Sequence, residues 1–429
     1  MINGNSLFRF PSLSLPCLLA VALSCPLAGQ AEDKYLGVAT CASSNCHGAT
    51  SPRRGTVLQN EFSTWHKHGR HSKAWTVLLE PDAQKIGDHL GIANPESDSW
   101  CLSCHATYVP NKSLQGDKYT VEDGVSCETC HGAAERWIAS HTRSGATHEQ
   151  NVQNGMTDLA PLSSRTRLCL DCHYGNENQV VNHKLIGAGH PRLTFELDTF
   201  SITQPYHWKH DDDYIKRKGE YISAKAWLVG QIILASERMA TLLSPKRSKD
   251  GTWPELTLFT CGSCHHSLTE DQWKKRRYGS RVGELHLNLS SLIIAKEALK
   301  AVDSKTASEI ESLMANLHED YKNGVVDDVT AIKKLLDTKA TSAAMNLEYN
   351  DANLKKLYAQ MVRFGTLPYF RYEEAEQILM GMSSILASSE SLSRQYKAEV
   401  DKLYEALQND EAFKAEDFTE GTSKLLRNL

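Results

Sequence analysis

The sequence predicts a mainly α fold in two unlike parts, a first part with little regular structure and a C-terminal helical bundle. Residues 32–283 hold 16 of the 18 histidines and every cysteine that follows residue 31, and they are rich in Gly, Ser, Asn and Pro. Residues 284–429 contain no cysteine and show the amphipathic periodicity of packed helices. Residues 1–31 are expected to form a separate leader.

The helices are predicted from apolar residues that recur at helical spacing. In the second part this pattern covers residues 310–321, 353–364, 373–386 and 392–407. Asp303 and Ser304 are cap candidates for the first of these segments, and Gly365 ends the second. In the first part the same pattern occurs at residues 224–242, before Pro245. We interpret residues 284–429 as a packing or interaction bundle.

The first 31 residues have the features of a secretory signal peptide. Arg9 is the only charged residue before Glu32, and an apolar stretch from about residue 13 to 27 precedes small residues that suit cleavage after Ala31. A lipoprotein leader modified at Cys25 is the alternative, although the three residues before Cys25 form a poor lipobox. No later stretch reaches the roughly 20 apolar residues of a membrane span. We therefore expect a periplasmic chain, free or membrane-associated, without a transmembrane segment in its mature form.

At five places in the chain, the second cysteine of a pair is followed directly by a histidine. The five motifs are Cys41 and Cys46 with His47, Cys101 and Cys104 with His105, Cys127 and Cys130 with His131, Cys169 and Cys172 with His173, and Cys261 and Cys264 with His265. Cys-x-x-Cys-His is the attachment signature of c-type haem, in which two thioethers hold the porphyrin and the histidine binds the iron as proximal ligand. The first motif has four residues between its cysteines, a variant of multihaem cytochromes. We expect five covalently bound haem c groups.

Structural zinc is the main alternative for repeated cysteine pairs. Zinc does not require a histidine directly after every second cysteine, and a thioredoxin-type motif explains neither the histidine nor the repetition. The five motifs also use all ten cysteines of the mature chain, so none remains for a disulfide. Porphyrins would supply the apolar bulk that residues 32–283 lack, so the fold class is a multihaem cytochrome core followed by the helical bundle.

Two segments resemble a known family. Residues 65–75, WHKHGRHSKAW, and residues 127–145, CETCHGAAERWIASHTRSG, resemble the tetrahaem cytochrome c-554 of ammonia-oxidising bacteria. That family shares its haem packing with hydroxylamine oxidoreductase and pentahaem nitrite reductase. The resemblance covers about residues 35–180. GAGHPRL at residues 187–193 and CHH at residues 264–266 are features of broader pentahaem c-554-like proteins.

The resemblance implies second, distal ligands among the thirteen other histidines. It makes His141 the distal ligand of the first haem and His71 the distal ligand of another haem, expected to be the third. His190 is the next candidate, because the glycines before it permit close approach of the backbone to a flat ring. Weaker candidates are His148, His183, His207, His210 and His266, whereas His66 and His68 are expected to face solvent. Arg143 and Arg192 follow ligand candidates and are expected either to bind propionates or to be solvated.

The expected function is electron transfer between redox partners. The formal net charge of −5, made more negative by haem propionates, disfavours nucleic acid and suits periplasmic or membrane-anchored redox proteins. We assign no catalytic residue. The alternative is an oxidoreductase in which one five-coordinate haem acts on a small nitrogen or sulfur compound, since the second haem of the c-554 family lacks a strong distal ligand. A third hypothesis is that residues 284–429 dock a partner.

Overall fold

The computed structural model describes residues 32–55, 57–265, 286–319, 325–368, 371–410 and 412–429. The expected leader, residues 1–31, lies outside them. The described residues form helices joined by turns, with only two short strands, so the predicted mainly α class is confirmed. Within this described part, no helix combines the length and the apolar character that crossing a bilayer requires.

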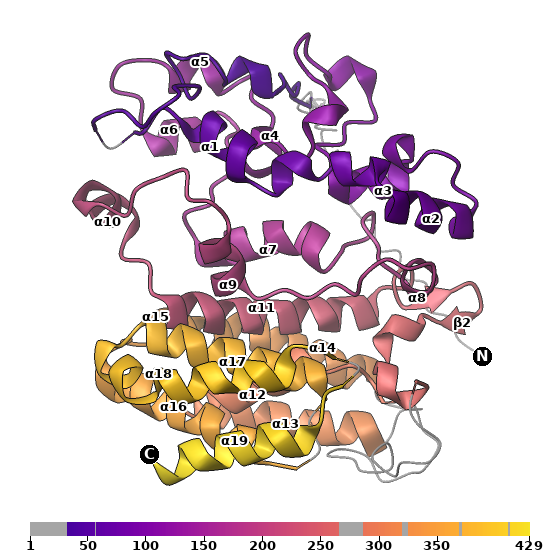
Figure 1. Ribbon diagram of the computed structural model, residues 1–429, viewed down its shortest axis with the longest axis vertical. Coiled ribbons are helices and arrows are strands. Elements are labelled where there is room, and N and C mark those ends of the chain that lie inside the picture. Colours follow the sequence, from indigo (N-terminus) through magenta and orange to yellow (C-terminus); the bar gives the residue numbers. More distant parts are fainter. Residues whose placement is uncertain (1–31, 56, 266–285, 320–324, 369–370, 411) are drawn as a thin grey trace, which may run out of the picture. The chain divides into compact units, whose positions relative to one another are not determined.

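Residues 33–222, which we call the motif region, form short helices separated by irregular chain (Figure 1). Polar side chains begin several of these helices, as Asp98 does by accepting a hydrogen bond from the N–H of Trp100. The helices are α1 (Glu61–His68), α2 (Pro81–Leu90), α3 (Ser99–His105), α4 (Cys127–His131), α5 (Ile138–His141), α6 (His148–Gln153), α7 (Leu162–His173), α8 (His183–Gly187), α9 (Leu197–Thr203) and α10 (Asp212–Lys218).

Longer helices follow, and we call them together the helical bundle. They are α11 (Ser223–Leu243), α12 (Ser290–Leu299), α13 (Ser304–Glu319), α14 (Val325–Leu335), the π-helix η10 (Leu336–Ala340), α15 (Thr341–Asn346), α16 (Asp351–Gly365), α17 (Tyr372–Ala387), α18 (Glu390–Leu403) and α19 (Ala415–Arg427). Between α11 and α12 lie the antiparallel strands β1 (Lys249–Asp250) and β2 (Trp253–Pro254), and then the fifth motif.

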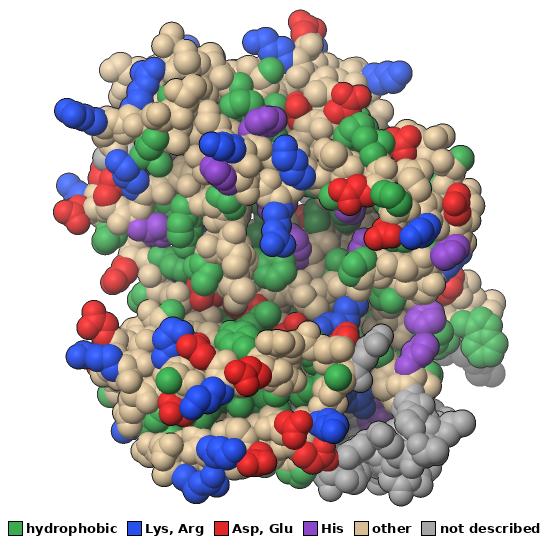
Figure 2. All heavy atoms as spheres, viewed as in Figure 1, with side chains coloured by type: hydrophobic (Ala, Val, Ile, Leu, Met, Phe, Trp, Pro, Cys, Tyr) green, Lys and Arg blue, Asp and Glu red, His purple; other side chains and the backbone are tan. Residues whose placement is uncertain are grey.

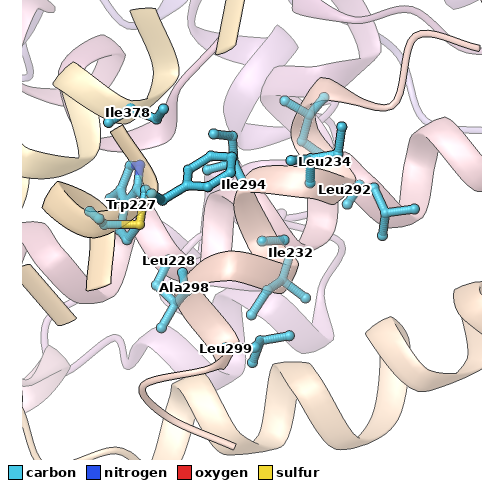
Figure 3. Packing of buried hydrophobic residues seen from close by; sticks show 14 of the residues in the cluster. Trp227, Leu228, Ile232, Leu234, Leu292, Ile294, Ala298, Leu299 and Ile378 are labelled. Carbon is cyan, nitrogen blue, oxygen red and sulfur yellow. The ribbon is translucent and has the colours of Figure 1, made fainter. Parts of the chain in front are cut away.

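Helix α11 lies at the centre of the hydrophobic core. It packs against α7 and α9 of the motif region and against α12, α14 and α17 of the bundle (Figure 1). Trp227, Leu228 and Ile232 on α11 are fully buried and pack near Leu292, Ile294 and Ala298 of α12 (Figure 3). A helix that is apolar on nearly all sides is typical of such a position between layers.

Two glycines bring neighbouring helices close to α11. A side chain at Gly230 of α11 would lie 2.7 Å from Cβ of Leu197 on α9, and one at Gly381 of α17 would lie 2.4 Å from Cζ2 of Trp227. Only glycine therefore permits these two contacts without a shift of the backbone. Through them α11 joins the motif region to the C-terminal helices.

The motif region has almost no apolar core of its own, as the sequence predicts. Its separate cluster of buried apolar residues consists of Leu78, Leu102 and Ala106. Helices α11, α13, α16, α17 and α18 agree with the predicted helical segments, and Asp303 caps α13 by accepting from the N–H of Thr306. The predicted domain boundary at residues 283 and 284 lies outside the described residues and stays a prediction.

Candidate haem-binding sites

Each of the five cysteine–histidine motifs lies on a helical turn or a tight turn. The second motif ends α3, the third forms α4, the fourth ends α7, and the fifth begins in a 3-10 turn, η8 (Cys261–Ser263). In one helical turn, residues i and i+3 lie on the same face, so both thiols of each motif can reach one porphyrin. In the first motif, the N–H of His47 donates to the carbonyl of Cys41 at 3.1 Å, which closes the longer spacer into a turn. None of these ten cysteines forms a disulfide.

A second histidine ring lies beside the histidine of every motif. The ring centroids of the five pairs are 6.0 to 6.4 Å apart. The pairs are His47 with His141, His105 with His190, His131 with His207, His173 with His71, and His265 with His183. Figure 2 shows histidine side chains gathered over the motif region, several of them around a hollow in its surface.

The spacing of the paired rings fits an iron held between them. An imidazole nitrogen lies about 2 Å from a metal ion that it binds, and its ring centroid lies about 1 Å further out, so opposite imidazoles on one iron have centroids about 6 Å apart. Among the described residues, no three His, Cys, Asp or Glu side chains come together as a metal site. The residues present thus fit iron bound by two histidines within a porphyrin.

Hydrogen bonds hold one nitrogen of several of these rings. Nδ1 of His47 lies 2.9 Å from Oε2 of Glu61, Nδ1 of His105 lies 2.8 Å from the carbonyl of Ala74, and Nδ1 of His190 lies 2.8 Å from the carbonyl of Pro191. An Nδ1–H that donates to such an acceptor fixes the tautomer and leaves Nε2 free as a metal ligand. The same arrangement is usual around histidines that bind metals.

Burial keeps two of the motif histidines in the form that binds metal. It lowers the pKa of His131 and of His173 to about 4 in each case. Both rings are therefore neutral at physiological pH, and only the neutral ring has a lone pair for iron. His47 differs, because its hydrogen bond to Glu61 raises its pKa.

Glu128, which the sequence does not single out, connects residues 36 and 37 to the third motif by hydrogen bonds. It is 2% exposed, and its carboxylate accepts hydrogen bonds from the N–H groups of Leu36, Gly37 and Ala134, each at 2.8 Å. Gly37 adopts φ +87°, where its missing side chain leaves room for the carbonyl of Lys118. Glu128 therefore fixes residues 36 and 37, which lead into the first motif.

The motifs are neighbours in an order that differs from their order in the sequence. The side chains of Cys41 and Cys127 lie close enough to interact, as do those of Cys104 and Cys172. Burial, together with the nearby thiol of Cys130, raises the pKa of Cys169 to about 12. These contacts join the first motif to the third, the third to the fourth and the fourth to the second.

The three distal candidates expected from the sequence all lie beside a motif histidine. His141 lies beside His47 of the first motif, as expected. His71 lies beside His173 of the fourth motif, and not beside the third motif as expected. The N–H of Val125 donates to the carbonyl of His71 at 3.0 Å, so the backbone of His71 lies near the third motif while its ring lies beside His173. His190 lies beside His105 of the second motif.

The other histidines and arginines that the sequence analysis named lie in different surroundings. His207 and His183 were weaker candidates, and each lies beside a motif histidine; no signal in the nearby sequence distinguishes them. His148 instead contacts Asp158, His210 accepts from the indole of Trp208, and His66 and His68 are exposed. His266 lies outside the described residues. Arg143 is exposed, and Arg192 forms ion pairs with Glu373 and Glu376.

Comparison with known proteins finds similarity to one family. The family model described as "Cytochrome c554 and c-prime" matches residues 40–132. Cytochrome c-554 of Nitrosomonas europaea is 26% identical over 212 residues, which are 46% of this chain and 79% of the relative. No solved structure matches the chain. The two matches show that part of this chain is similar to cytochrome c-554 proteins.

Proposed function

We propose that this chain is a periplasmic c-type cytochrome that binds five haem c groups, each between two histidines, and transfers electrons between redox proteins. The observation that carries the proposal is the set of five histidine pairs with ring centroids 6.0 to 6.4 Å apart. Every motif histidine takes part in one pair. Histidines that were neighbours by chance would not be expected to pair with the motif histidine of all five motifs.

Each residue of a site has a separate role in this proposal. The two cysteines of a motif form thioethers, the motif histidine binds the iron from one face, and its partner binds from the other. Haem bound in this way supplies reversible one-electron chemistry at its iron. Two strong protein ligands leave no coordination position for a substrate. The chain's own contribution is therefore ligation, burial and spacing.

The contacts between motifs support a continuous row of sites. The cysteine contacts place the motifs in the order first, third, fourth and second. The fifth site follows the second, because their distal candidates lie close to each other along the chain. His183 is the first residue of the short helix α8, and His190 follows the end of that helix. The first and fifth sites thus form the two ends of the row. We propose that redox partners exchange electrons with the protein at these ends.

The surroundings of the second site favour a carrier over an enzyme. The resemblance to the c-554 family implies a second haem without a strong distal ligand, which is the position an enzyme would use. In this chain, the ring of His190 lies 6.4 Å from that of His105. A catalytic haem would require that this ligand be absent or displaced.

The location of the protein follows from the same proposal. Residues 1–31 lie outside the described part of the chain, so export rests on the sequence pattern of the leader and on the haem-attachment motifs. We propose cleavage after Ala31 and maturation in the periplasm. The partners are periplasmic or membrane-anchored redox proteins, and residues 284–429 form a C-terminal helical domain.

Haem counting and spectroscopy on the exported protein test the proposal. Intact mass and a pyridine haemochrome assay should give five haems for each chain. Electron paramagnetic resonance of the oxidised protein should show only low-spin iron, and carbon monoxide should leave the Soret band of the reduced protein unchanged. The variant His141→Ala is the positive control and should produce one high-spin haem. Fewer than five haems, or carbon monoxide binding by the parent protein, would refute the proposal.

A further inference from the structure

The chain segment that follows His190 has little support from its own backbone. Residues 188–196 form neither helix nor strand. The N–H of His190 donates to the carbonyl of Leu185 at 3.2 Å, but residues 191–195 form no backbone–backbone hydrogen bond with other described residues. Backbone hydrogen bonds thus hold the chain up to His190, and the segment after it depends on side-chain contacts.

One side-chain contact lies before His190. Nδ1 of His89, on α2, lies 2.9 Å from the carbonyl of Ala188, which accepts its hydrogen bond. The adjacent Gly189 adopts φ +116° and lies against the side chain of Ile86, also on α2. Helix α2 thus holds the segment on the N-terminal side of the ring.

The second contact lies two residues after His190 and involves α17 of the bundle. Nη2 of Arg192 lies 3.4 Å from Oε2 of Glu376, and Nη1 lies 4.0 Å from Oε1 of Glu373. The guanidinium also lies over the ring of Tyr372, 5.3 Å from its centroid. The side chain of Glu376 is 17% exposed, so water replaces its arginine partner poorly.

Helix α17 is a firm support for this contact. It packs against α11, α12, α16 and α18, and Ile378 and Met382 on it are fully buried. The hydrogen bond from Nδ2 of Asn288 to Oε2 of Glu373, at 3.1 Å, links the same carboxylate to the chain that leads into α12. Helix α17 therefore offers the side chain of Arg192 partners whose backbone is fixed by the core.

We propose that Arg192 is a positioning residue that holds His190 beside His105 by binding Glu373, Glu376 and Tyr372 of α17. The C-terminal helices then determine whether the iron of the second site keeps its sixth ligand. This inference rests on the proposed function, because it requires that His190 bind iron. It gives α17 a role in coordination although residues 284–429 contain no haem motif.

The variant Arg192→Gln, made in the full-length protein with its haems, tests the inference. The haem count should stay at five, because all motif cysteines remain. One haem of the five should become partly high-spin in the paramagnetic resonance spectrum, and the reduced protein should bind up to one carbon monoxide where the parent binds none. Arg192→Lys keeps the charge and should restore most of the low-spin signal.

A matched control uses an arginine of the bundle that lies far from any motif in the sequence. Arg394 on α18 pairs with Glu390 one turn away, and its side chain is 79% exposed. Arg394→Gln should leave haem count, spin state and carbon monoxide binding unchanged. If Arg192→Gln reduces folding or haem loading, Glu376→Gln is the second variant, because it weakens the same contact and retains the arginine.

The variant His190→Ala separates the two proposals. If His190→Ala leaves every haem low-spin, His190 is not a ligand and the proposed ligation of the second site is wrong. If His190→Ala creates a high-spin haem but Arg192→Gln and Glu376→Gln both stay low-spin without carbon monoxide binding, the positioning role of Arg192 is wrong and the proposed function stands. A high-spin signal in all three variants supports both proposals.

Discussion

Removal of the Glu128 carboxylate should weaken the fold at the start of the motif region. The three N–H groups that it accepts, from Leu36, Gly37 and Ala134, would lose their partner in a place where the side chain is 2% exposed. A buried donor left without an acceptor costs about 1–3 kcal/mol. Three such donors give an expected loss of at least about 3 kcal/mol in the free energy of unfolding for Glu128→Ala.

The two carboxylate oxygens of Glu128 accept different numbers of hydrogen bonds, so two variants at this position should lose different amounts of stability. Oε1 accepts from Leu36 and Ala134, whereas Oε2 accepts only from Gly37. In Glu128→Gln the amide oxygen can keep the first two bonds, and its NH₂ group would face the N–H of Gly37. The expected loss is then about 1–3 kcal/mol, because one donor is unpaired.

Guanidinium unfolding followed at the Soret band measures these losses, with the haem count of each variant checked first. The control is Glu122→Gln, six residues earlier at an exposed position, which should change the stability by no more than about 0.5 kcal/mol. If Glu128→Ala unfolds at the same guanidinium concentration as the parent, the three hydrogen bonds do not hold residues 36 and 37. If Glu128→Gln costs as much as Glu128→Ala, the division between the two oxygens is wrong.

Three further predictions concern a redox potential, a pH dependence and a core contact. Replacing Glu61 by Gln leaves His47 with a neutral hydrogen-bond partner. Because hydrogen bonds to charged groups are stronger by about 1 kcal/mol, the midpoint potential of one haem should rise by about 40 mV in a redox titration. An unchanged set of potentials would contradict this prediction. Burial raises the pKa of Glu196 from 4.5 to about 7, so the native state binds this proton more tightly than the unfolded state and stability should fall by roughly 3 kcal/mol as pH rises from 4.5 to 7. Unfolding at pH 4.5 and pH 8 should show this fall in the parent and not in Glu196→Gln, and equal slopes would exclude it. Gly381→Ala places a Cβ atom 2.4 Å from Cζ2 of Trp227, and such overpacking costs about 1–3 kcal/mol, so the thermal midpoint should drop; a higher midpoint would show that α17 can move away.

Local sequence patterns predict the helices and one half of each candidate site. The spacing of Leu354, Leu357 and Met361 predicts α16, and those three side chains are buried on one face. The motif histidines are equally local, because each directly follows its second cysteine. Such features depend only on residues that lie within a few turns of one another.

The partners of the motif histidines depend on the path of the whole chain, which periodicity does not encode. His71 and His173 are about a hundred residues apart, and His131 meets His207 only because the chain after α9 returns over the third motif. The family resemblance singles out His141 and His71 but assigns His71 to the third haem, whereas its ring lies beside the fourth motif. Likewise, the apolar pattern of residues 224–242 predicts a helix, yet its neighbours α12, α14 and α17 come later in the sequence.

The central place of α11 has a consequence for how the chain assembles. Domains generally fold as units, with N-terminal parts first during synthesis, but most partners of α11 lie after residue 290. The apolar surface around Trp227 and Ile232 therefore stays uncovered until the last third of the chain has arrived. The motif region cannot complete its contact with α11 as an independent early unit. Under the proposed function, haem attachment at the first four motifs would then have an interval before the C-terminal helices cover α11.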